Sequence, residues 1–247
     1  MKLEVKMIYE NKTRSIIKAV SWRILATLQT SIIVLIITDK IELAVSAGII
    51  DIIVKMMTYY FHERMWNYIK FGKKSKPSFV IWFTGLSGAG KTTIATEVYQ
   101  ELKKSELKIE YLDGDVIRSI FPKTGFTKEE RNRHLGRVAF LASMLSKNGV
   151  STVAAFISPY EESRKFARSL SEVFVEVYLS TPVEECERRD VKGLYKQARE
   201  GKIQHFTGIN DPYEPPQNPE ISIDTTNKSV FEAKKIIIDY LKKKDLI

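Results

Sequence analysis

Two long apolar runs dominate the pattern of hydrophobic and polar positions in the first quarter of the chain. Residues 20–38 form the first run and residues 41–60 the second, and the short polar stretch DKIE lies where they meet. At about 1.5 Å per residue, a helix over the first run is about 28 Å long, close to the roughly 30 Å of a bilayer's hydrocarbon core. We therefore expect residues 1–70 to form a hairpin of two antiparallel transmembrane helices.

The second run carries two opposite charges near its middle. Asp51 and Lys55 are four residues apart with the acidic residue first, so a helix places them on one face as an ion pair. These charges, together with Gln29, also fit a soluble amphipathic helix pair, which remains the alternative. A cleavable signal peptide is not expected, because no small-residue cleavage pattern separates the two runs.

The basic excess of the chain is concentrated around these runs. The net charge is +9, and residues 1–76 hold 13 Lys and Arg against 6 Asp and Glu, a net charge of +7. Because basic residues flank both outer ends of the hairpin, the positive-inside rule predicts a membrane anchor with both termini, and the domain that follows, in the cytoplasm. No nucleic-acid-binding motif accompanies the charge, and we expect no nucleic-acid partner.

After a linker at residues 71–77, the pattern changes to alternating strands and helices. Short apolar runs predict strands over residues 79–84, 108–113, 151–157, 174–179 and 221–225. Helical periodicity predicts helices over residues 91–104, 128–147, 161–170, 182–190 and 229–243. Such alternation is typical of an α/β fold in which helices cover both faces of a parallel sheet, here over residues 78–247.

Two of these helices begin with a capping-box pattern. Thr127 is followed by Glu130, and Thr181 is followed by Pro182 and Glu184. We expect each threonine hydroxyl to accept a hydrogen bond from the first turn of its helix.

A glycine-rich segment with the pattern of a phosphate-binding loop follows the first of the predicted strands. Gly85-x4-Gly90-Lys91-Thr92 lies between a strand and a helix, where backbone N–H groups and the helix N-terminus can hold a phosphate. Lys91 is expected to contact the β- and γ-phosphates of ATP, and the Thr92 hydroxyl to bind Mg²⁺. The expected ATP-binding residues are Gly85, Leu86, Ser87, Gly88, Ala89, Gly90, Lys91, Thr92 and Thr93.

Polar residues follow the second predicted strand in the segment LDGDVIR. Asp113, Asp115 and Arg118 are expected at the carboxyl end of the sheet, where ligands of open α/β folds bind. Two carboxylates and an arginine beside a Mg-nucleotide suit phosphoryl transfer. Guanine-recognition and motor-ATPase signatures are missing from the sequence, so a small-molecule kinase is the expected class. The one cysteine, Cys186, excludes an intramolecular disulfide and fits a reducing compartment.

The order of several motifs resembles the adenylylsulfate kinase family. The segments are GLSGAGKTTIA, YLDGDVIR, GFTKEERNRHLGRVAFLASML, AAFISPYEESRKFAR and FVEVYLSTPVEECERRDVKGLYKQAREGKIQHFTGINDPYEPPQNPEISIDT. The resemblance covers nearly all of residues 78–241. It implies transfer of the ATP γ-phosphate to the 3′-hydroxyl of adenosine 5′-phosphosulfate (APS), giving 3′-phosphoadenylyl sulfate (PAPS) in sulfate activation. KAVSWRILATLQT and KMMTYYFHERMWNYI likewise resemble a family of two-helix membrane domains of unknown function.

The resemblance also implies roles for individual residues. Asp113 belongs to the magnesium shell with Thr92, and Asp115 orients or deprotonates the acceptor hydroxyl. The sequence does not decide which of the two aspartates has which role. Ser158 corresponds to a serine described as a phosphorylated intermediate in the family. Direct transfer needs no such intermediate, so we expect a binding role for Ser158 ahead of a catalytic one. The expected acceptor-binding residues are Asp115, Arg118, Phe126, Arg131, His134, Ile157, Ser158, Lys192, Leu194, Phe206, Thr207, Gly208 and Ile209. His134 departs from the asparagine that is common in the family.

A basic stripe lies within the segment that resembles the family's mobile lid. Lys192, Lys196, Arg199 and Lys202 would share one face of a helix, and a solvated charged face is the usual explanation for such spacing. The resemblance favours a phosphate contact for Lys192.

Two other function classes remain open. The chain could be another P-loop metabolite kinase, or a membrane scaffold whose nucleotide-binding module has no activity. We expect a homodimer that receives APS from a separate ATP sulfurylase.

Overall fold

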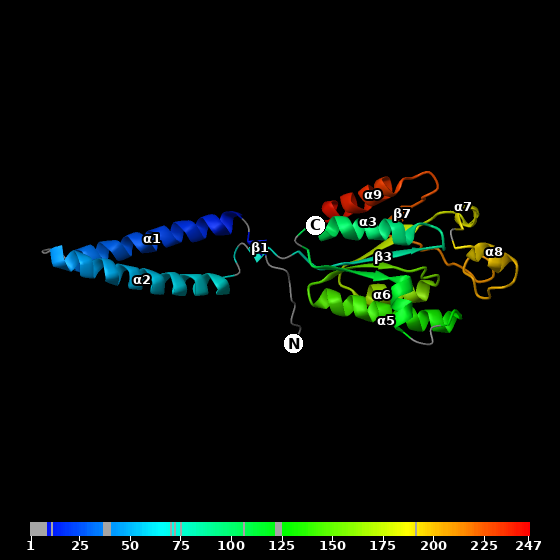
Figure 1. Ribbon diagram of the computed structural model, residues 1–247, viewed down its shortest axis with the longest axis horizontal. Coiled ribbons are helices and arrows are strands. Elements are labelled where there is room, and N and C mark those ends of the chain that lie inside the picture. The colour runs from blue at the N-terminus through cyan, green and yellow to red at the C-terminus, as the bar shows by residue number, and fades with distance from the viewer. Residues whose placement is uncertain are drawn as a thin grey trace. The chain divides into compact units, whose positions relative to one another are not determined.

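The structure, a computed structural model, describes most of the chain: residues 9–10, 12–36, 41–69, 71, 73–74, 76–105, 107–121, 125–190 and 192–247. It divides into two compact units. One is Ile8–Ser75, and the other contains Lys76–Ile247. Figure 1 shows a helical hairpin in the first unit and a layered α/β domain in the second.

The first unit is built on helices α1 (Lys12–Ile36) and α2 (Ile41–Tyr68). A short antiparallel pair joins β1 (Tyr9–Glu10) to β2 (Lys73–Lys74). The two helices are antiparallel, because contacts such as Ser21 Oγ to His62 Nε2 at 3.0 Å and Gln29 Nε2 to Thr58 Oγ1 at 3.0 Å run in opposite directions along them.

Arg14 closes the open end of this hairpin. It is fully buried, and its guanidinium donates to the carbonyl oxygens of Ile69 at 2.7 Å and Phe71 at 2.6 Å, and to that of Trp66. Because the last carbonyls of a helix have no partner within the helix, these bonds satisfy groups that α2 leaves open at its end.

Across the residues that the structure describes, no helix combines the length and the apolar character needed to cross a membrane. The predicted spans over 20–38 and 41–60 contain positions outside the described residues, among them residues 37–40. The side chain of Asp51 also lies outside them, so the predicted ion pair with Lys55 stays a prediction.

The second unit contains one parallel sheet in the order β4-β5-β3-β6-β7. Its strands are β3 (Val80–Gly85), β4 (Ile109–Asp113), β5 (Ser151–Ala155), β6 (Phe174–Leu179) and β7 (Ile221–Ile223). All neighbouring strands pair in parallel. The α/β fold with a parallel sheet is therefore confirmed.

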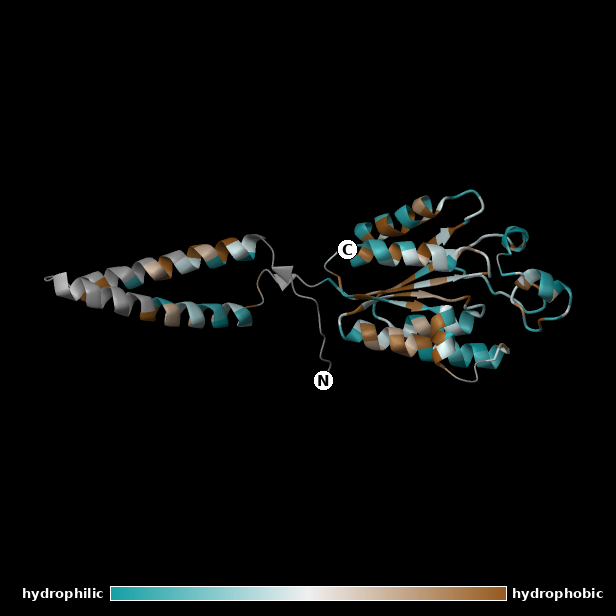
Figure 2. Ribbon diagram, in the orientation of Figure 1, coloured by the Kyte–Doolittle hydropathy of each residue, from teal (hydrophilic) through white to brown (hydrophobic). Residues whose placement is uncertain are grey.

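Helices cover both faces of this sheet. They are α3 (Lys91–Lys103), α4 (Gly114–Ile120), α5 (Lys128–Lys147), α6 (Glu161–Leu170), α7 (Val183–Arg189), α8 (Leu194–Arg199) and α9 (Val230–Lys243). Figure 1 shows α3 and α9 on one face and α5 and α6 on the other. Each face has its own apolar core, and Figure 2 shows that the strands between them are largely apolar.

One of the two predicted capping boxes is confirmed and the other is wrong. Thr127 and Glu130 form a reciprocal capping box at the start of α5. Pro182 rather than Thr181 precedes α7, and no side chain caps this helix. The Thr181 hydroxyl is buried and lies 2.7 Å from Thr225 Oγ1 instead, so it ties α7 to the segment after β7.

Candidate active site

The phosphate-binding loop connects β3 to α3 at the carboxyl end of the central strand. Gly85 has a φ of 144°, and a Cβ there would lie 2.8 Å from the carbonyl oxygen of Leu179 on the neighbouring strand. Gly88 has a φ of 77°, and a Cβ there would lie 2.8 Å from the carbonyl oxygen of Cys186. Only glycine fits both the backbone conformation and the space, which lets the chain turn tightly over the sheet.

Side chains from elsewhere hold the carbonyl groups of this loop. The Tyr195 hydroxyl donates to the Ser87 oxygen at 2.9 Å, and the Thr225 hydroxyl donates to the Ala89 oxygen at 3.2 Å. Carbonyls held in this way leave the loop's N–H groups available to an anion, which is the arrangement that binds phosphate.

Lys91 lies over the same loop. Its Nζ donates to the carbonyl oxygen of Leu86 at 2.7 Å. Burial lowers the pKa of Lys91 to about 8, and the negative charge of Asp115 partly offsets this lowering. The ammonium group is therefore held in a site that an added negative charge would stabilise.

Asp113 and Asp115 have different surroundings. Asp113 Oδ1 caps α4 by accepting from the N–H groups of Asp115 at 2.9 Å and Val116 at 3.2 Å, and the Tyr111 hydroxyl lies 3.2 Å from Asp113 Oδ2. The side chain of Asp115 is 82% exposed and its Oδ2 lies 2.7 Å from Lys192 Nζ. Asp113 is thus fixed in orientation, whereas Asp115 faces the open site.

Oxygen donors suited to magnesium lie beside the loop. Burial raises the pKa of Tyr111 to about 12, so its hydroxyl remains a donor to Asp113. Among the described residues no three His, Cys, Asp or Glu side chains cluster as a metal cage. One carboxylate and one hydroxyl, from Asp113 and Thr92, fit Mg²⁺, which usually keeps waters and binds substrate phosphates instead of a complete protein cage.

Two arginines meet at the ring of Phe126. The guanidinium of Arg118 lies 4.6 Å from the ring centroid and that of Arg131 5.4 Å from it. Arg131 Nε donates to the Phe126 oxygen at 2.8 Å and its Nη2 to the His205 oxygen at 2.6 Å. Burial lowers the pKa of both guanidinium groups, and their mutual repulsion adds to the effect for Arg118. This cationic pair favours an anionic ligand.

His134 lies one turn after Arg131 and is buried. Its ring meets Phe121 and Phe156 edge-on, with centroids 6.1 Å away in each case. Neither ring nitrogen has a hydrogen-bond partner among the described residues. Burial lowers the pKa of His134 to about 4, with further lowering by Arg118 and Arg137.

The turn after β5 contains Ile157 and Ser158. Ser158 is buried, and its φ of 46° is unusual for a residue other than glycine. Trp82 Nε1 donates to Ser158 Oγ at 2.9 Å. The hydroxyl is therefore enclosed and already bonded, which favours a role in the shape of the site.

The segment after α7 brings one of the four stripe cations to the site. Lys192 reaches Asp115, whereas Arg199 pairs with Glu187 at 3.0 Å and Lys202 with Glu200 at 2.6 Å. The prediction of one helical stripe over 192–202 is wrong, because α8 spans only Leu194–Arg199. Asp190 ends the preceding helix and accepts from three N–H groups at the start of α8.

Phe206, Thr207, Gly208 and Ile209 follow α8 as a turn. Phe206 is buried and packs edge-on against Tyr195, with ring centroids 4.9 Å apart. The predicted aromatic partners Phe126 and Phe206 thus have separate contacts, Phe126 with arginines and Phe206 with a tyrosine. The predicted sandwich of an adenine between them stays a prediction.

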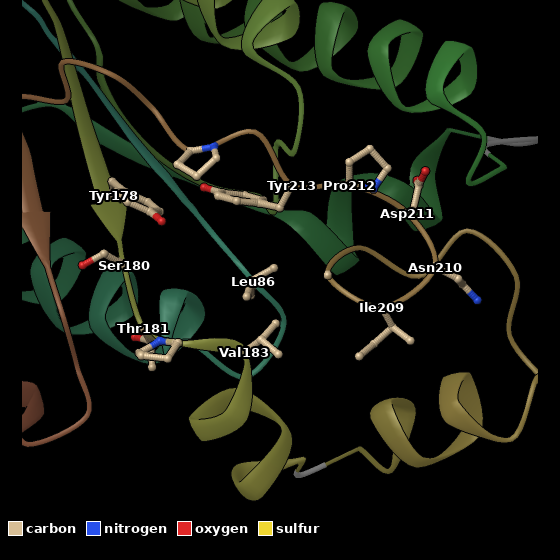
Figure 3. A pocket seen from close by; sticks show the side chains of 13 residues that line it. Leu86, Tyr178, Ser180, Thr181, Val183, Ile209, Asn210, Asp211, Pro212 and Tyr213 are labelled. Atoms are coloured by element: carbon tan, nitrogen blue, oxygen red, sulfur yellow. The ribbon is translucent and has the colours of Figure 1, made fainter.

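A cavity of about 610 Å³ lies beside this turn (Figure 3). Leu86, Gly208 and Ile209 line it together with residues that the sequence did not single out. Tyr178 and Tyr213 stack in its wall with centroids 5.9 Å apart. Asp211, also in the wall, accepts from the Tyr160 hydroxyl at 2.8 Å and lies 3.9 Å from Arg131 Nε. Tyr178, Asp211 and Tyr213 lie within the longest of the family-like segments, but the sequence analysis assigned them no role.

Comparisons with known proteins agree with the geometry. Residues 77–224 match the family model described as adenylylsulphate kinase, and residues 16–67 match a family described as a predicted membrane protein (DUF2061). The adenylyl-sulfate kinase of Halothermothrix orenii is 47% identical over 175 residues, which are 70% of this chain and 95% of that protein. That of Synechococcus sp. (strain JA-2-3B'a(2-13)) is 46% identical over 174 residues, 70% of this chain and 99% of that protein.

Solved structures show the same likeness. The Mycobacterium tuberculosis APS kinase CysC, in complex with AMPPNP and APS, aligns with 68% of this chain and 99% of that chain at 38% identity and a TM-score of 0.65. A hexameric APS kinase from Thiobacillus denitrificans aligns with 70% of this chain and 30% of that chain at 29% identity and a TM-score of 0.55. By its sequence, its P-loop fold and these matches, the chain belongs to the adenylylsulfate kinase family.

Proposed function

We propose that this chain transfers the γ-phosphate of ATP to the 3′-hydroxyl of adenosine 5′-phosphosulfate, giving PAPS. One observation carries the proposal beyond family membership. The exposed carboxylate of Asp115 is close enough to Lys91 in the phosphate-binding loop and to Arg118 to offset part of the lowering of their pKa by burial. Arg118 in turn forms a cationic pair with Arg131 at the ring of Phe126. A base, an anion site and a nucleotide site in one place are what this transfer requires.

ATP binds through the phosphate-binding loop. The loop's N–H groups and the first turn of α3 hold the phosphates, and Lys91 leaves the Leu86 carbonyl to contact them. Thr92 and Asp113 would hold Mg²⁺, which neutralises charge on the transferring phosphoryl group when bound.

The acceptor binds between α4, the start of α5 and the turn after β5. Arg118 and Arg131 receive the phosphosulfate, and Phe126 and Phe206 receive the adenine. Asp115 is the better candidate for the 3′-hydroxyl, because Asp113 is fixed as the cap of α4 and Asp115 faces the open site.

The transfer is direct. The 3′-oxygen forms a bond to the γ-phosphorus while the bond from that phosphorus to the β,γ-bridging oxygen breaks, and the hydroxyl proton passes to Asp115. ADP leaves with the bridging oxygen. Ser158 is proposed as a wall of the acceptor site and carries no phosphoryl group, because its hydroxyl is buried and bonded to Trp82.

Labelled ATP and a panel of acceptors test this function with the purified full chain. We expect a labelled product with APS and none with gluconate, shikimate or water. Faster transfer to another small metabolite would replace the proposal with a different P-loop kinase. Nucleotide binding without transfer to any acceptor would favour the scaffold.

The hairpin is proposed to hold the kinase at the cytoplasmic face of a membrane. Among its described residues, polar contacts lie between the helices, as in Lys18 with Glu63 at 3.3 Å and Ser21 with His62. Large apolar side chains instead face outward on both helices: Ile16, Val20, Ile24, Ile53, Met56, Met57, Tyr60, Phe61 and Met65. This is the reverse of what a soluble helix pair shows, and the matched family is described as a predicted membrane protein.

Two further partners belong to the same proposal. We propose that APS comes from a separate ATP sulfurylase. The chain also self-associates as a homodimer, for which the hexameric state of one relative gives a precedent.

A further inference from the structure

One buried guanidinium joins two segments that border the proposed acceptor site. Arg164, on α6, is 3% exposed. Its Nη1 donates to the Ser158 oxygen at 2.7 Å and its Nη2 to the Glu214 oxygen at 2.6 Å. The planar fork of an arginine can hold two acceptors at a fixed separation, which a lysine cannot do.

The first of these segments is the turn after β5, and its backbone is strained. Ser158 has a φ of 46°, a conformation that is unfavourable for a residue other than glycine, so the turn needs support from outside. Thr84 Oγ1 donates to the Ile157 oxygen at 2.8 Å, and Trp82 Nε1 donates to Ser158 Oγ. Arg164 adds a charge-assisted bond to the Ser158 carbonyl itself.

The second segment continues from the turn at Phe206–Ile209. The Glu214 N–H donates to the Pro159 oxygen at 2.8 Å, and the Glu161 N–H donates to Glu214 Oε2 at 2.7 Å. Tyr213, whose ring lies in the cavity wall in Figure 3, is within 5.9 Å of the Arg164 guanidinium. The segment is therefore attached to the start of α6 next to Arg164.

The charge of Arg164 is balanced inside the protein. Its Nε lies 3.1 Å from Glu176 Oε1 on β6, and both side chains are buried. Arg168 also reaches Glu176, at 3.2 Å, and pairs with Glu220 at 2.7 Å. The ion pair with Glu176 orients the guanidinium, and the oriented guanidinium then holds the two carbonyl groups that border the site.

We propose that Arg164 is a positioning residue for the acceptor: it fixes the Ile157–Ser158 turn relative to residues 206–214, so that both walls of the acceptor site are in place before the acceptor binds. The inference rests on the proposed function, because that function makes these walls the APS site. The two carbonyl bonds of Arg164 go to Ser158 and Glu214 and not to the phosphate-binding loop, so ATP binding should depend on Arg164 less than acceptor binding does.

Replacing Arg164 by lysine is the decisive test of this role. The variant keeps a positive charge opposite Glu176 but loses one of the two carbonyl bonds.

 

In the full-length chain, Arg164→Lys should raise the KM for APS about tenfold, the factor expected for one charge-assisted hydrogen bond. The KM for ATP should change less than about twofold. Arg164→Met, which loses both carbonyl bonds, should raise the KM for APS further. If Arg164→Met fails to fold, the double variant Arg164→Met/Glu176→Gln takes its place, because it also removes the buried negative charge that Arg164 balances together with Arg168.

Lys165→Met is the matched control, because Lys165 is the next residue, is exposed and, within the part of the chain that the structure describes, pairs with Glu161 one helical turn away. It should leave both Michaelis constants unchanged. The indole N–H of Trp82 reports on the turn directly, and its NMR resonance should shift in Arg164→Lys and stay in place in Lys165→Met.

Equal increases of both Michaelis constants in a folded Arg164→Lys variant would overturn the inference, and so would an unchanged KM for APS. Those outcomes leave the proposed function intact, because the wild-type chain is measured with APS in the same assay. A wild-type chain that does not phosphorylate APS would overturn the proposed function, and this inference with it.

Discussion

At the scale of single residues, the two aspartates of the segment LDGD differ in what they contact. Asp113 caps α4 with one oxygen, while Asp115 exposes its carboxylate beside Lys192. A carboxylate that receives a proton from a bound hydroxyl must be reachable from the site. The contacts therefore favour Asp115 for the proposed proton transfer and Asp113 for the proposed magnesium site, two roles that the sequence did not distinguish.

Asp115→Asn should abolish most turnover without unfolding the protein. We expect kcat to fall by about 10²–10⁴, the range typical of a positioned general base. Stability should be unchanged, because the lost pair with Lys192 is exposed and such pairs contribute little. Steady-state kinetics and a melting curve measure both, with Asp239→Asn on the exposed face of α9 as a control. A near-native kcat would refute the assignment of Asp115.

His134 should make the folded protein sensitive to acid. Its pKa is lowered from 6.5 to about 4 by burial, so between these values the unfolded chain binds a proton that the folded chain excludes. Stability is therefore lost as the pH falls from about 6.5 towards 4. His134→Asn removes this group, and the melting temperature should fall less between pH 7 and pH 5 than in the wild type. Parallel pH profiles for the two proteins would contradict the prediction.

At the scale of elements, the start of α5 links stability to the acceptor site. The capping box of Thr127 and Glu130 fixes the first turn of the helix that carries Arg131. An equivalent box, Ser229 with Glu232, begins α9. The two boxes have the same chemistry, but the second lies on an element that contributes no residue to the site.

Thr127→Ala should therefore cost both stability and acceptor binding, whereas Ser229→Ala should cost stability alone. Each substitution is expected to lower the free energy of unfolding by about 1 kcal/mol. Only Thr127→Ala should raise the KM for APS, since the orientation of Arg131 depends on that turn. Denaturant unfolding and steady-state kinetics test this, and a raised KM for APS in Ser229→Ala would show that the effect is general loss of stability.

Local patterns predicted the parallel sheet and the phosphate-binding loop, because both depend on apolar periodicity and on glycine at specific positions. The short helix α4 was not predicted, and α8 is shorter than the helical stripe expected over residues 192–202, since six or seven residues give no periodic signal. Thr181 matched a capping pattern but bonds to Thr225, 44 residues away, and Arg164 acts on carbonyls of distant segments. Contacts of this kind arise from tertiary packing and have no local sequence signature.

At the scale of the whole molecule, the chain is two compact units with opposite surface character. The unit of residues 76–247 buries its apolar side chains in two cores on either side of its sheet. The hairpin places polar contacts between its helices and exposes large apolar side chains. Every residue assigned to the site lies beyond Lys76, so we expect catalysis to be separable from the proposed membrane attachment.

A chain that begins at Lys76 should therefore be soluble and should phosphorylate APS with a kcat within about twofold of the full-length value, because no assigned residue is removed. The full-length protein should sediment with membranes and resist both high salt and carbonate. Serine at Ile16, Val20 and Ile24, an exposed stripe on α1, should weaken this attachment and leave kcat unchanged. Release by salt alone would indicate surface attachment through the basic residues. Full-length protein in the soluble fraction would mean that the outward apolar side chains pack against protein, and the membrane proposal would be wrong.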